Sequence, residues 1–488
     1  MVAALAVGHL VAGFVEPTAS PFVAVSDAVL DLSPHPVTEW AKATFGTLDK
    51  LVLLLGVALV LAGLTVAAGL LSRRRAWPGQ LIAGGLGALG VVVVVASTDM
   101  GQLAVLAPAA ALLVGVVAFN RLHGLAVLST AEHSDSRRRF LRTTAGVVVG
   151  AGVAGVAGQL IGSRVDVEAS RAGVGPLRPA DPGPPVPRGA DFTADGSTRF
   201  ITSNADFYRI DTALTLPRVL AEEWRLRVHG MVDRELNLSF DDIRRRPLVE
   251  RAITLACVSN EVGGGLISTA RFVGVPIREL LVEAGVRAES DQLLSTSVDG
   301  FTAGTPVDVL LDEARGALLA IGMNGEPLPV EHGFPARMVV PGLYGYVSAT
   351  KWVTDWELTT FAAKEGYWVP RGWSALGPIK VQSRIDSPRD GDSVSGTVTV
   401  AGTAWAQPVG VETVEVSVDG GRWRATELAV EVNLNTWRMW RTRLRLPRGE
   451  HRIEVRATDH NGATQTSDQA PPAPDGATGW HTITVNVD

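Results

Sequence analysis

The sequence predicts a chain of three parts: membrane-spanning helices, then an α+β domain, then an all-β sandwich. Residues 51–72 contain no charge and are long enough to cross a bilayer. Short strand-like and helix-like segments alternate between 196 and 376, and alternating apolar residues continue from 377 to the end. The chain has 488 residues, 46% of them hydrophobic and 19% charged, which is too long for one compact domain and too apolar for an ordinary soluble protein.

The first part, residues 1–130, is expected to hold the transmembrane helices. Two further apolar runs follow the first clear span, at 81–97 and 102–119. An earlier apolar stretch, 1–15, ends at Glu16 and would make a short first span. A charge at the centre of a span costs roughly 2.5–3.5 kcal/mol, so runs without charge indicate lipid-facing helices.

The arginines indicate the orientation of these spans. Arg73, Arg74 and Arg75 follow the span at 51–72, and Arg121 follows the run at 102–119. Cytoplasmic loops are enriched in arginine, so both of these ends are expected inside the cell. Segment 26–50 and Asp99 are then expected outside, with the amino terminus inside if residues 1–15 span.

Residues 131–165 combine an export-like motif with another apolar helix. The sequence SRRRFLR at 136–142 resembles the twin-arginine export motif, and a mildly apolar stretch follows at 144–162. A basic patch beside a membrane helix is the alternative. Twin-arginine export carries folded proteins, which suits a domain loaded with its cofactor in the cytoplasm. Residues after about 163 are therefore expected outside the membrane.

The exported part divides into a linker and two domains. Residues 166–195 hold six prolines between Pro176 and Pro187, which favours an extended linker. Segments such as WRLRVHGMV, ARMVVPGLYGYVSATKW, FDDIRR and VPIRELLVEAG make 196–376 an α+β domain. In 377–488 alternating valines precede Asp419-Gly420, a hairpin signal, so a small β-sandwich is expected there.

Charge and cysteine content limit the chemistry. A net charge of −6 gives no reason to expect a nucleic-acid surface. The single cysteine, Cys257, excludes an internal disulfide and a CxxCH haem site. It ends the apolar run AITLAC and precedes the glycine-rich turn VSNEVGGG. Such a cysteine is more often a small buried apolar residue, but its place at a strand end beside a loop favours a functional thiolate.

Several longer segments resemble one enzyme family. These are LACVSNEVGGGLISTARFVGVPIRELLVEAG around Cys257, HGFPARMVVPGLYGYVSATKW at 332–352, AGTAWA at 401–406, VEVSVDGGRW at 414–423 and TWRMW at 436–440. In this order they resemble the sulfite oxidase family of molybdenum enzymes, over about 200–488. The resemblance implies a sulfite-oxidase-like α+β molybdopterin domain at 196–376, followed by an immunoglobulin-like dimerisation domain at 377–488.

The resemblance also implies a cofactor and its contacts. The cofactor is molybdenum held by a pyranopterin dithiolene, with Cys257 as the metal's thiolate ligand. A soft thiolate suits such a metal. The matching positions that would contact the cofactor are Asn204, Phe207, Tyr208, Ser297, Asp299, His332, Arg337, Gly345, Tyr346, Val347 and Lys351. Arg209 and Arg371 are expected to supply positive charge for an oxyanion substrate.

The implied activity is oxygen-atom transfer, with sulfite oxidation as the leading expectation. Val258, Ser259, Asn260 and Glu261 stand after the cysteine, where sulfite-oxidising members carry arginines. Reduction of methionine sulfoxide, the reductive branch of the family, is the alternative. Other classes are a sortase-like cysteine transpeptidase and a non-enzymatic adhesion protein.

The expected partners are a small oxyanion or sulfoxide, a separate electron-transfer protein, the membrane and a second copy bound through the last domain. The histidines near the spans, His9, His35 and His123, are too few and scattered to argue for membrane haem.

Overall fold

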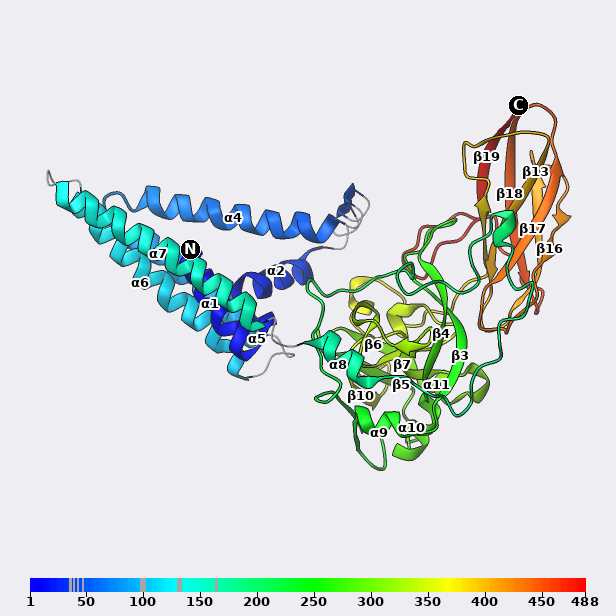
Figure 1. Ribbon diagram of the computed structural model, residues 1–488, viewed down its shortest axis with the longest axis horizontal. Coiled ribbons are helices and arrows are strands. Elements are labelled where there is room, and N and C mark those ends of the chain that lie inside the picture. Colours follow the sequence, from blue (N-terminus) through cyan, green and yellow to red (C-terminus); the bar gives the residue numbers. More distant parts are fainter. Residues whose placement is uncertain are drawn as a thin grey trace. The chain divides into compact units, whose positions relative to one another are not determined.

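The computed structural model describes residues 1–34, 37, 40–41, 44–45, 48–96, 102–129, 134–162 and 166–488. His35 and Asp99 lie outside the described residues. The chain divides into two compact units. One comprises Met1–Asp166 with Ala213–Leu216, and the other comprises Val167–Thr212 with Pro217–Asp488 (Figure 1). Each unit is described by itself.

The first unit is helical. Its helices are α1 (Val2–Val15), α2 (Pro21–Leu32), α4 (Asp49–Leu71), α5 (Trp77–Ala96), α6 (Leu106–Ser129) and α7 (Ser134–Gly162). Among the described residues, four stretches are long and apolar enough to cross a membrane: Asp49–Leu71, Trp77–Ala96, Gln102–Val127 and Arg138–Ile161. The runs predicted at 51–72, 81–97 and 102–119 coincide with the first three.

Helix α1 is shorter than a membrane span. Its 14 residues extend about 21 Å at 1.5 Å per residue, against a hydrocarbon core of about 30 Å. Helix α1 packs instead against α6 and α7 within the unit. Ala12 on α1 is fully buried in a small apolar cluster with Ala19, Val94 and Ala107.

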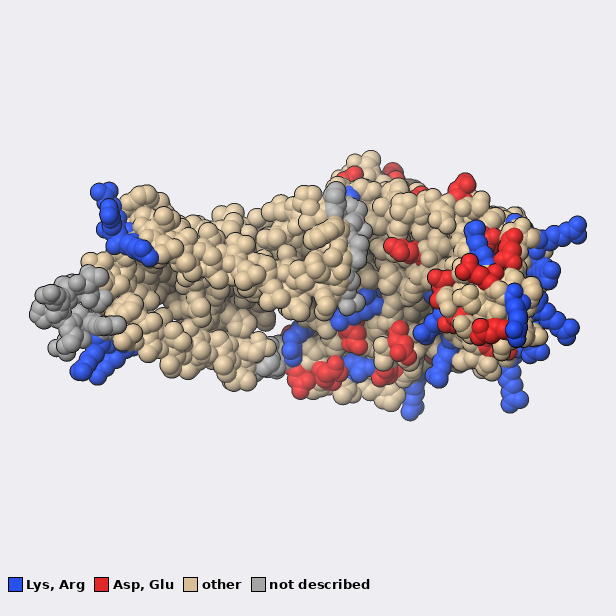
Figure 2. Space-filling model, turned by 90° about the horizontal axis from the view of Figure 1, so that it is seen from above, with Lys and Arg blue, Asp and Glu red and all other residues tan. Residues whose placement is uncertain are grey.

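The arginine motif belongs to the beginning of a helix. Helix α7 runs without a break from Ser134 to Gly162, so SRRRFLR and the apolar stretch after it form one helix. Figure 2 shows the surface of the helices as almost free of charged side chains, with Lys and Arg gathered at one end. This distribution is typical of helices that lie in lipid with their basic ends in the headgroups.

The second unit begins with a helix that the sequence does not predict. Helix α8 (Val167–Val174) lies at the start of the proline-rich segment. Arg171 of α8 donates hydrogen bonds to the carbonyls of Pro327 and Leu328 and pairs with Glu326 at 2.8 Å. The residues after α8 run mostly as extended chain, and Asp181 forms a parallel bridge with Val249. The segment expected as a linker therefore packs along the next domain.

The α+β domain contains two sheets. The first has the order β2-β1-β10-β5-β6, with β1 (Arg225–Gly230), β2 (Leu236–Ser239), β5 (Gln292–Ser297), β6 (Thr302–Pro306) and β10 (Val353–Thr359). The second has the order β3-β4-β7-β8, with β3 (Val249–Ala256), β4 (Ile267–Pro276), β7 (Leu318–Met323) and β8 (Glu326–Pro327); β9 (Arg337–Val339) pairs with β7. Helices α9 (Phe240–Arg244), α10 (Ile277–Ala284) and α11 (Val307–Leu311) connect the strands.

The predicted local elements of this domain are largely confirmed. FDDIRR forms α9, VPIRELLVEAG leads into α10 and WRLRVHGMV contains β1. The segment ARMVVPGLYGYVSATKW is less regular than its β-rich composition predicts, because only Arg337–Val339 forms a strand. Pro341 cannot donate a ladder hydrogen bond and Gly342 has a φ of 80°, so the strand stops there.

The C-terminal domain is the predicted β-sandwich. One sheet has the order β11-β13-β17-β16, with β11 (Gln382–Ser387), β13 (Thr397–Trp405), β16 (Glu427–Leu428) and β17 (Arg438–Arg445). The other has the order β12-β19-β18-β14-β15, with β12 (Ser393–Val394), β14 (Val411–Val418), β15 (Arg424–Ala425), β18 (Gly449–Asp459) and β19 (His481–Val487). The hairpin β14–β15 turns at Asp419 and Gly420, whose φ angles of 52° and 68° are those of the predicted tight turn.

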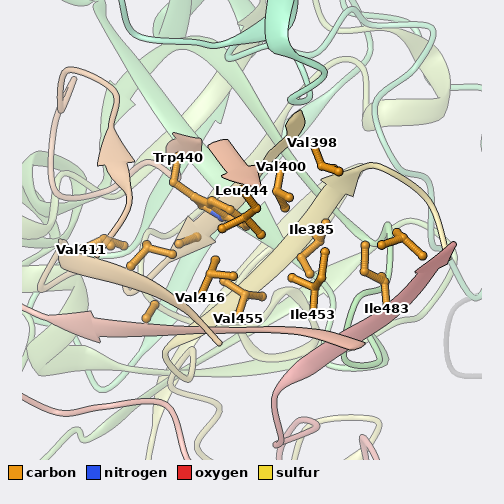
Figure 3. Close-up of a cluster of buried hydrophobic side chains, with 14 of the residues drawn as sticks. Ile385, Val398, Val400, Val411, Val416, Trp440, Leu444, Ile453, Val455 and Ile483 are labelled. Atoms are coloured by element: carbon orange, nitrogen blue, oxygen red, sulfur yellow. The ribbon is translucent and has the colours of Figure 1, made fainter. Parts of the chain in front are cut away.

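The core of the sandwich consists of alternating inward residues from both sheets. Figure 3 shows Trp440 and Val400 of one sheet facing the layer that holds Val416, Val455 and Ile453 of the other. Trp440, Ile453 and Val455 are fully buried. The strand alternation that predicted the domain thus places one side chain in two inside.

Substitution in this core is expected to destabilise the sandwich. Ile453→Ala removes a fully buried side chain and leaves a cavity, so the free energy of unfolding should fall by about 2–5 kcal/mol. Val430→Ala, at a half-exposed position of the same domain, should change it by less than about 0.5 kcal/mol. Thermal unfolding of the full chain in detergent measures both. Equal midpoints for the two variants would contradict this packing.

Candidate functional site

Cys257 stands at the turn between β3, the edge strand of its sheet, and β4. Strand β3 ends at Ala256 and β4 begins at Ile267, and the loop between them closes on itself. The Cys257 N–H donates to the Leu266 carbonyl at 2.9 Å, and the Leu266 N–H donates to Asn260 Oδ1 at 2.7 Å. The Ser259 N–H approaches the Cys257 sulfur at 3.4 Å, which favours a thiolate over a thiol. Cys257 stands at the predicted strand end beside the glycine-rich loop, and its side chain is buried.

Tyr208 brings a second segment to this cysteine. Burial raises the pKa of the Tyr208 phenol, the negative charge of Cys257 raises that pKa further, and Arg337 opposes the rise. The phenol therefore keeps its proton as a hydrogen-bond donor. A Cβ built on Gly345 would lie 3.8 Å from both the Tyr208 hydroxyl and the Ala256 carbonyl oxygen. Tyr208, Gly345 and the cysteine's own strand thus meet at one place.

Arg337 is a buried cation beside this meeting point. Its side chain is buried, and its guanidinium donates only to the backbone carbonyls of His332, Met338 and Ala349, at 3.2–3.4 Å. Among the described residues no carboxylate lies within ion-pair distance of it. Burial lowers the pKa of Arg337 to about 10, so it remains charged at neutral pH. A buried positive charge with only weak carbonyl partners favours binding of an anion.

His332 lies next to this arginine on a short helical turn, η6 (Val330–His332). Its Nε2 is 3.0 Å from the carbonyl of Asn204, which requires the proton on Nε2. Burial lowers the pKa of His332 to about 4, with a further contribution from Arg337. The ring of Phe207 meets it edge to face at a centroid distance of 5.3 Å. The histidine is therefore a neutral donor at physiological pH.

Asn204 connects the site to an open cleft. Its amide donates to Glu326 Oε1 at 2.5 Å and its Oδ1 accepts from Asn324 at 2.8 Å. Asn204 also lines a cleft of about 750 Å³ whose walls come from the α+β domain and, through Arg384 and Trp437, from the sandwich. This cleft gives a route from solvent to the edge of the site.

The segment Gly345–Val347 offers main-chain donors. It forms the short turn η7 (Gly345–Val347), and the N–H groups of Gly345 and Tyr346 have no protein acceptor in the described chain. The Tyr346 side chain turns toward other residues, because its hydroxyl donates to the Ser374 carbonyl at 2.7 Å. Burial also raises the pKa of Tyr346. The peptide backbone at this turn can therefore bind an anion, as the sequence predicts, whereas the Tyr346 phenol is engaged elsewhere.

Lys351 belongs to a partly compensated charge group. Its Nζ lies 3.2 Å from Asp211 Oδ2 and 3.1 Å from the Glu331 carbonyl. Burial lowers the pKa of Lys351 to about 8, while Asp211 opposes that shift. The same carboxylate accepts from Arg209 Nε at 2.9 Å. Arg209 is thus already paired, and its side chain is about half exposed.

Asp299 and Ser297 lie at the end of β5. The Asp299 N–H is 3.5 Å from the Ser297 hydroxyl oxygen, and burial raises the pKa of Asp299. The charge of Asp211 contributes to the same rise. Asp299 is therefore close enough to Asp211, the partner of Lys351, to feel its charge.

Arg371 contacts Tyr367 in the structure. It ends the short turn η8 (Val369–Arg371), where its guanidinium stacks 3.6 Å over the ring of Tyr367 and donates to the Tyr367 carbonyl. As a site for substrate charge, Arg371 stays a prediction.

Sequence reasoning missed three residues beside the site. Tyr344 is buried, and burial raises its pKa to about 12, with added effects from Asp475 and Cys257. Asp475 pairs with Lys380 at 2.8 Å, and Lys380 also donates to the Gly476 carbonyl. Asp211 is nearly buried between Lys351 and Arg209. The available signals were the adjacency of Tyr344 to Gly345 and the two-residue spacing of Asp211 from Arg209, whereas Asp475 comes from a distant segment.

The donor set fits a particular class of cofactor. No group of three or more His, Cys, Asp or Glu side chains able to hold a metal occurs in the part of the chain that the structure describes. A metal at Cys257 would therefore take its other ligands from an organic cofactor. Arg337 and the N–H groups of η7 supply donors for an anionic end of such a molecule, while the one N–H of neutral His332 stays on the Asn204 carbonyl. The fold and site define an α+β domain that can bind an anionic group close to a buried cysteine.

Comparison with known proteins assigns the family. Residues 213–368 match the oxidoreductase molybdopterin binding domain, and 382–485 match a bacterial Ig domain. Sulfite oxidase of Gallus gallus is 31% identical over 56% of this chain and 70% of its own length. The uncharacterized oxidoreductase YuiH of Bacillus subtilis is 35% identical over 32% of this chain and 74% of its own length. The chain belongs to the sulfite oxidase family of molybdopterin-dependent oxidoreductases. The predicted class is therefore confirmed, and the molybdopterin binding domain implies a molybdenum–pterin cofactor, while Cys257 as its ligand stays a prediction.

The share of a relative that this chain spans varies. The human mitochondrial sulfite oxidase is 32% identical over 56% of this chain, which spans 58% of the human protein. Among solved structures, the sulfane dehydrogenase SoxCD from Paracoccus pantotrophus superposes with a TM-score of 0.51 at 23% identity, covering 62% of this chain and 88% of that one. This likeness confirms the fold of the α+β domain with its sandwich.

The depressed pKa of His332 predicts an acid-dependent loss of stability. The pKa of this imidazole is about 6.5 in an unfolded chain, and burial lowers it to about 4 in the folded protein. Protons therefore bind the unfolded chain more strongly, so this contribution is complete above about pH 6.5 and falls as the pH drops toward about 4. In cofactor-free chain, the thermal midpoint of the wild type should fall more steeply over that window than that of His332→Gln. Parallel curves would show that His332 is not buried in its neutral form.

Proposed function

We propose that the chain oxidises sulfite at the outer face of a cell membrane, with a molybdenum–pyranopterin cofactor whose metal is bound by Cys257. The observation that carries this proposal is the buried Arg337, which lacks a carboxylate partner among the described residues and acts on Tyr208, the phenol that Cys257 also influences. Similarity to sulfite oxidases of several animals supports the substrate.

The residues around Arg337 would hold the cofactor. Arg337 and the N–H groups of Gly345 and Tyr346 would bind its phosphate, with Val347 completing the turn. His332 would contact the cofactor while its Nε2–H stays on the Asn204 carbonyl, and Lys351 would add charge by leaving Asp211. Asn204, Phe207, Tyr208, Ser297 and Asp299 would line the pterin.

Once bound, the cofactor supplies a metal that exchanges an oxygen atom with the substrate and takes up two electrons. The protein's part is to fix the thiolate and to present protons. Tyr208 and Tyr344 both keep their protons, because burial raises the pKa of each. Each phenol can donate a hydrogen bond to an oxyanion next to Cys257 without becoming charged itself.

Sulfite needs positive charge near this point. The main-chain N–H of Lys380 is 3.5 Å from the Tyr344 hydroxyl, and its ammonium would have to leave Asp475 to supply charge there. Arg209 and Arg371 stay proposed anion contacts, and each would have to leave its present partner, Asp211 or Tyr367. Glu261 is exposed, so its charge is screened by solvent.

The arginines of the helical unit support the proposed membrane side. Arg73, Arg74 and Arg75 connect α4 to α5, and arginines 137–139 begin α7. Cytoplasmic placement of both groups puts residues after α7 outside. The electrons would then pass to a separate acceptor protein on that side, and the sandwich would provide a contact for a second copy.

Replacement of the cysteine tests the proposal directly. The purified full chain should contain about one molybdenum per chain and oxidise sulfite, and Cys257→Ser should lose both. Ser259→Ala is the matched control, because it alters a side chain in the same loop and keeps the N–H that approaches the sulfur. Methionine sulfoxide is assayed in parallel. Reduction of the sulfoxide with no oxidation of sulfite would show that the sulfoxide, and not sulfite, is the substrate. An active chain that contains no metal would overturn the whole proposal.

Replacement of Arg337 distinguishes an arginine that binds the cofactor from one that only stabilises the fold. Arg337→Met should reduce cofactor content by about tenfold or more, since charge-assisted hydrogen bonds contribute roughly 1.5–3 kcal/mol. The cofactor-free variant should unfold at the same or a higher temperature, because a buried cation with no carboxylate is replaced by an apolar side chain. Arg244→Met, at an exposed position of α9, should change neither quantity. A large loss of stability with unchanged cofactor content would contradict an anion-binding role.

A further inference from the structure

The C-terminal sandwich contacts the cysteine's strand along its length. The Thr254 N–H on β3 donates to the Asn435 carbonyl at 3.0 Å, and the Thr254 hydroxyl accepts from the Trp437 N–H at 2.8 Å. Nearer the start of the strand, Asn433 donates to the Ala252 carbonyl at 3.1 Å. The loop Asn433–Trp437 of the sandwich thus lies along β3 like an additional strand.

The residues on both sides of the cysteine are buried against the same domain. Ala256 and Val258 belong to one apolar cluster with Trp405, Trp437 and Met439 of the sandwich. Each of these side chains is less than 5% exposed. Cys257 therefore stands between two residues that the sandwich covers.

The loop after the cysteine is held at two glycines. Arg384 of β11 donates from Nη1 to the Gly264 carbonyl at 2.7 Å. Its Nε pairs with Asp386 at 2.6 Å, and Asp386 also accepts from the Thr198 N–H at 3.0 Å. Both charged side chains are nearly buried, at 11% and 10% exposure, so this pair is fixed in one geometry and little screened.

The neighbouring glycine packs against a histidine of the sandwich. A Cβ on Gly263 would lie 2.3 Å from the His481 ring, and Gly263 has a φ of 78°. His481 is oriented by the Ile385 N–H, which donates to its Nδ1 at 2.9 Å. Only glycine fits between this ring and the loop, so the ring limits where the loop can move.

We infer that the sandwich is part of the catalytic centre, and that Arg384 and His481 are positioning residues which hold the 257–266 loop and so fix the Cys257 sulfur. The catalytic importance of this role rests on the proposed function, in which the Cys257 thiolate binds the metal. The holding of the loop itself does not depend on a metal. A role in dimer formation alone would not require contacts to this loop.

The rate of alkylation of Cys257 in the cofactor-free full chain tests directly whether Arg384 and His481 hold the 257–266 loop in place. Cys257 is the only cysteine, so iodoacetamide reports on it alone. Loss of a charge-assisted hydrogen bond of roughly 1.5–3 kcal/mol should speed alkylation in Arg384→Ala by about tenfold or more, through local opening. Arg384→Lys should restore part of the protection. Arg445→Ala, an exposed arginine of the same sheet, is the control and should react like the wild type.

A second variant covers the case in which Arg384→Ala does not fold. In His481→Asn the Oδ1 can still accept from the Ile385 N–H, while the ring against Gly263 is removed. It should also expose the thiol to faster alkylation. In the cofactor-loaded chain, the electron paramagnetic resonance spectrum of the half-reduced metal should shift in both variants and not in Arg445→Ala.

The outcomes separate this inference from the proposed function. Wild-type alkylation rates and spectra in folded Arg384→Ala and His481→Asn would overturn the positioning role, whatever Cys257→Ser shows. Faster alkylation in these variants, together with molybdenum retained in Cys257→Ser, would keep the holding of the loop and overturn the proposed metal ligand.

Discussion

The site is organised around a positive charge that the protein does not neutralise. Arg337 is buried, and the described residues offer its guanidinium only backbone carbonyls. Such a charge is unfavourable in the interior unless an anion is bound. Its effects reach the neighbouring groups, because it lowers the pKa of His332 and opposes the rise in that of Tyr208. The arrangement therefore favours a bound anion.

The second constraint is the position of the thiolate. Strand β3 leads to Cys257 between β4 on one edge and the Asn433–Trp437 loop of the sandwich on the other. Metal sites generally need such supporting contacts to hold their ligands in a productive geometry. The β-sandwich of this chain thus contributes to the site as well as to the fold.

Local patterns in the sequence predicted much of the fold. The charge-free runs became α4, α5 and α6, and the valine alternation became the core strands of the sandwich. Cys257 was found at the predicted strand end. These features depend on neighbouring residues, whose periodicity and turn preferences are visible in a single sequence. Helix α8 was missed because the prolines that follow it dominate the composition of that segment.

The contacts that define the site could not be predicted in the same way. Arg384 meets Gly264 across 120 positions, and Lys351 meets Asp211 across 140. No local pattern encodes such pairs. The resemblance to a family pointed to Arg337 and His332 as site residues. It did not predict that Arg337 lacks a carboxylate partner among the described residues, or that His332 is neutral. Arg209 and Arg371, chosen for their charge, already have partners in the structure.

X-ray absorption at the molybdenum edge tests the central claim most directly. Wild-type chain loaded with cofactor should show the dithiolene sulfurs and one further sulfur neighbour from Cys257. Cys257→Ser, if it retains enough metal to measure, should show one sulfur neighbour fewer. Identical sulfur coordination in the two proteins would contradict the assignment of Cys257 as the metal's ligand.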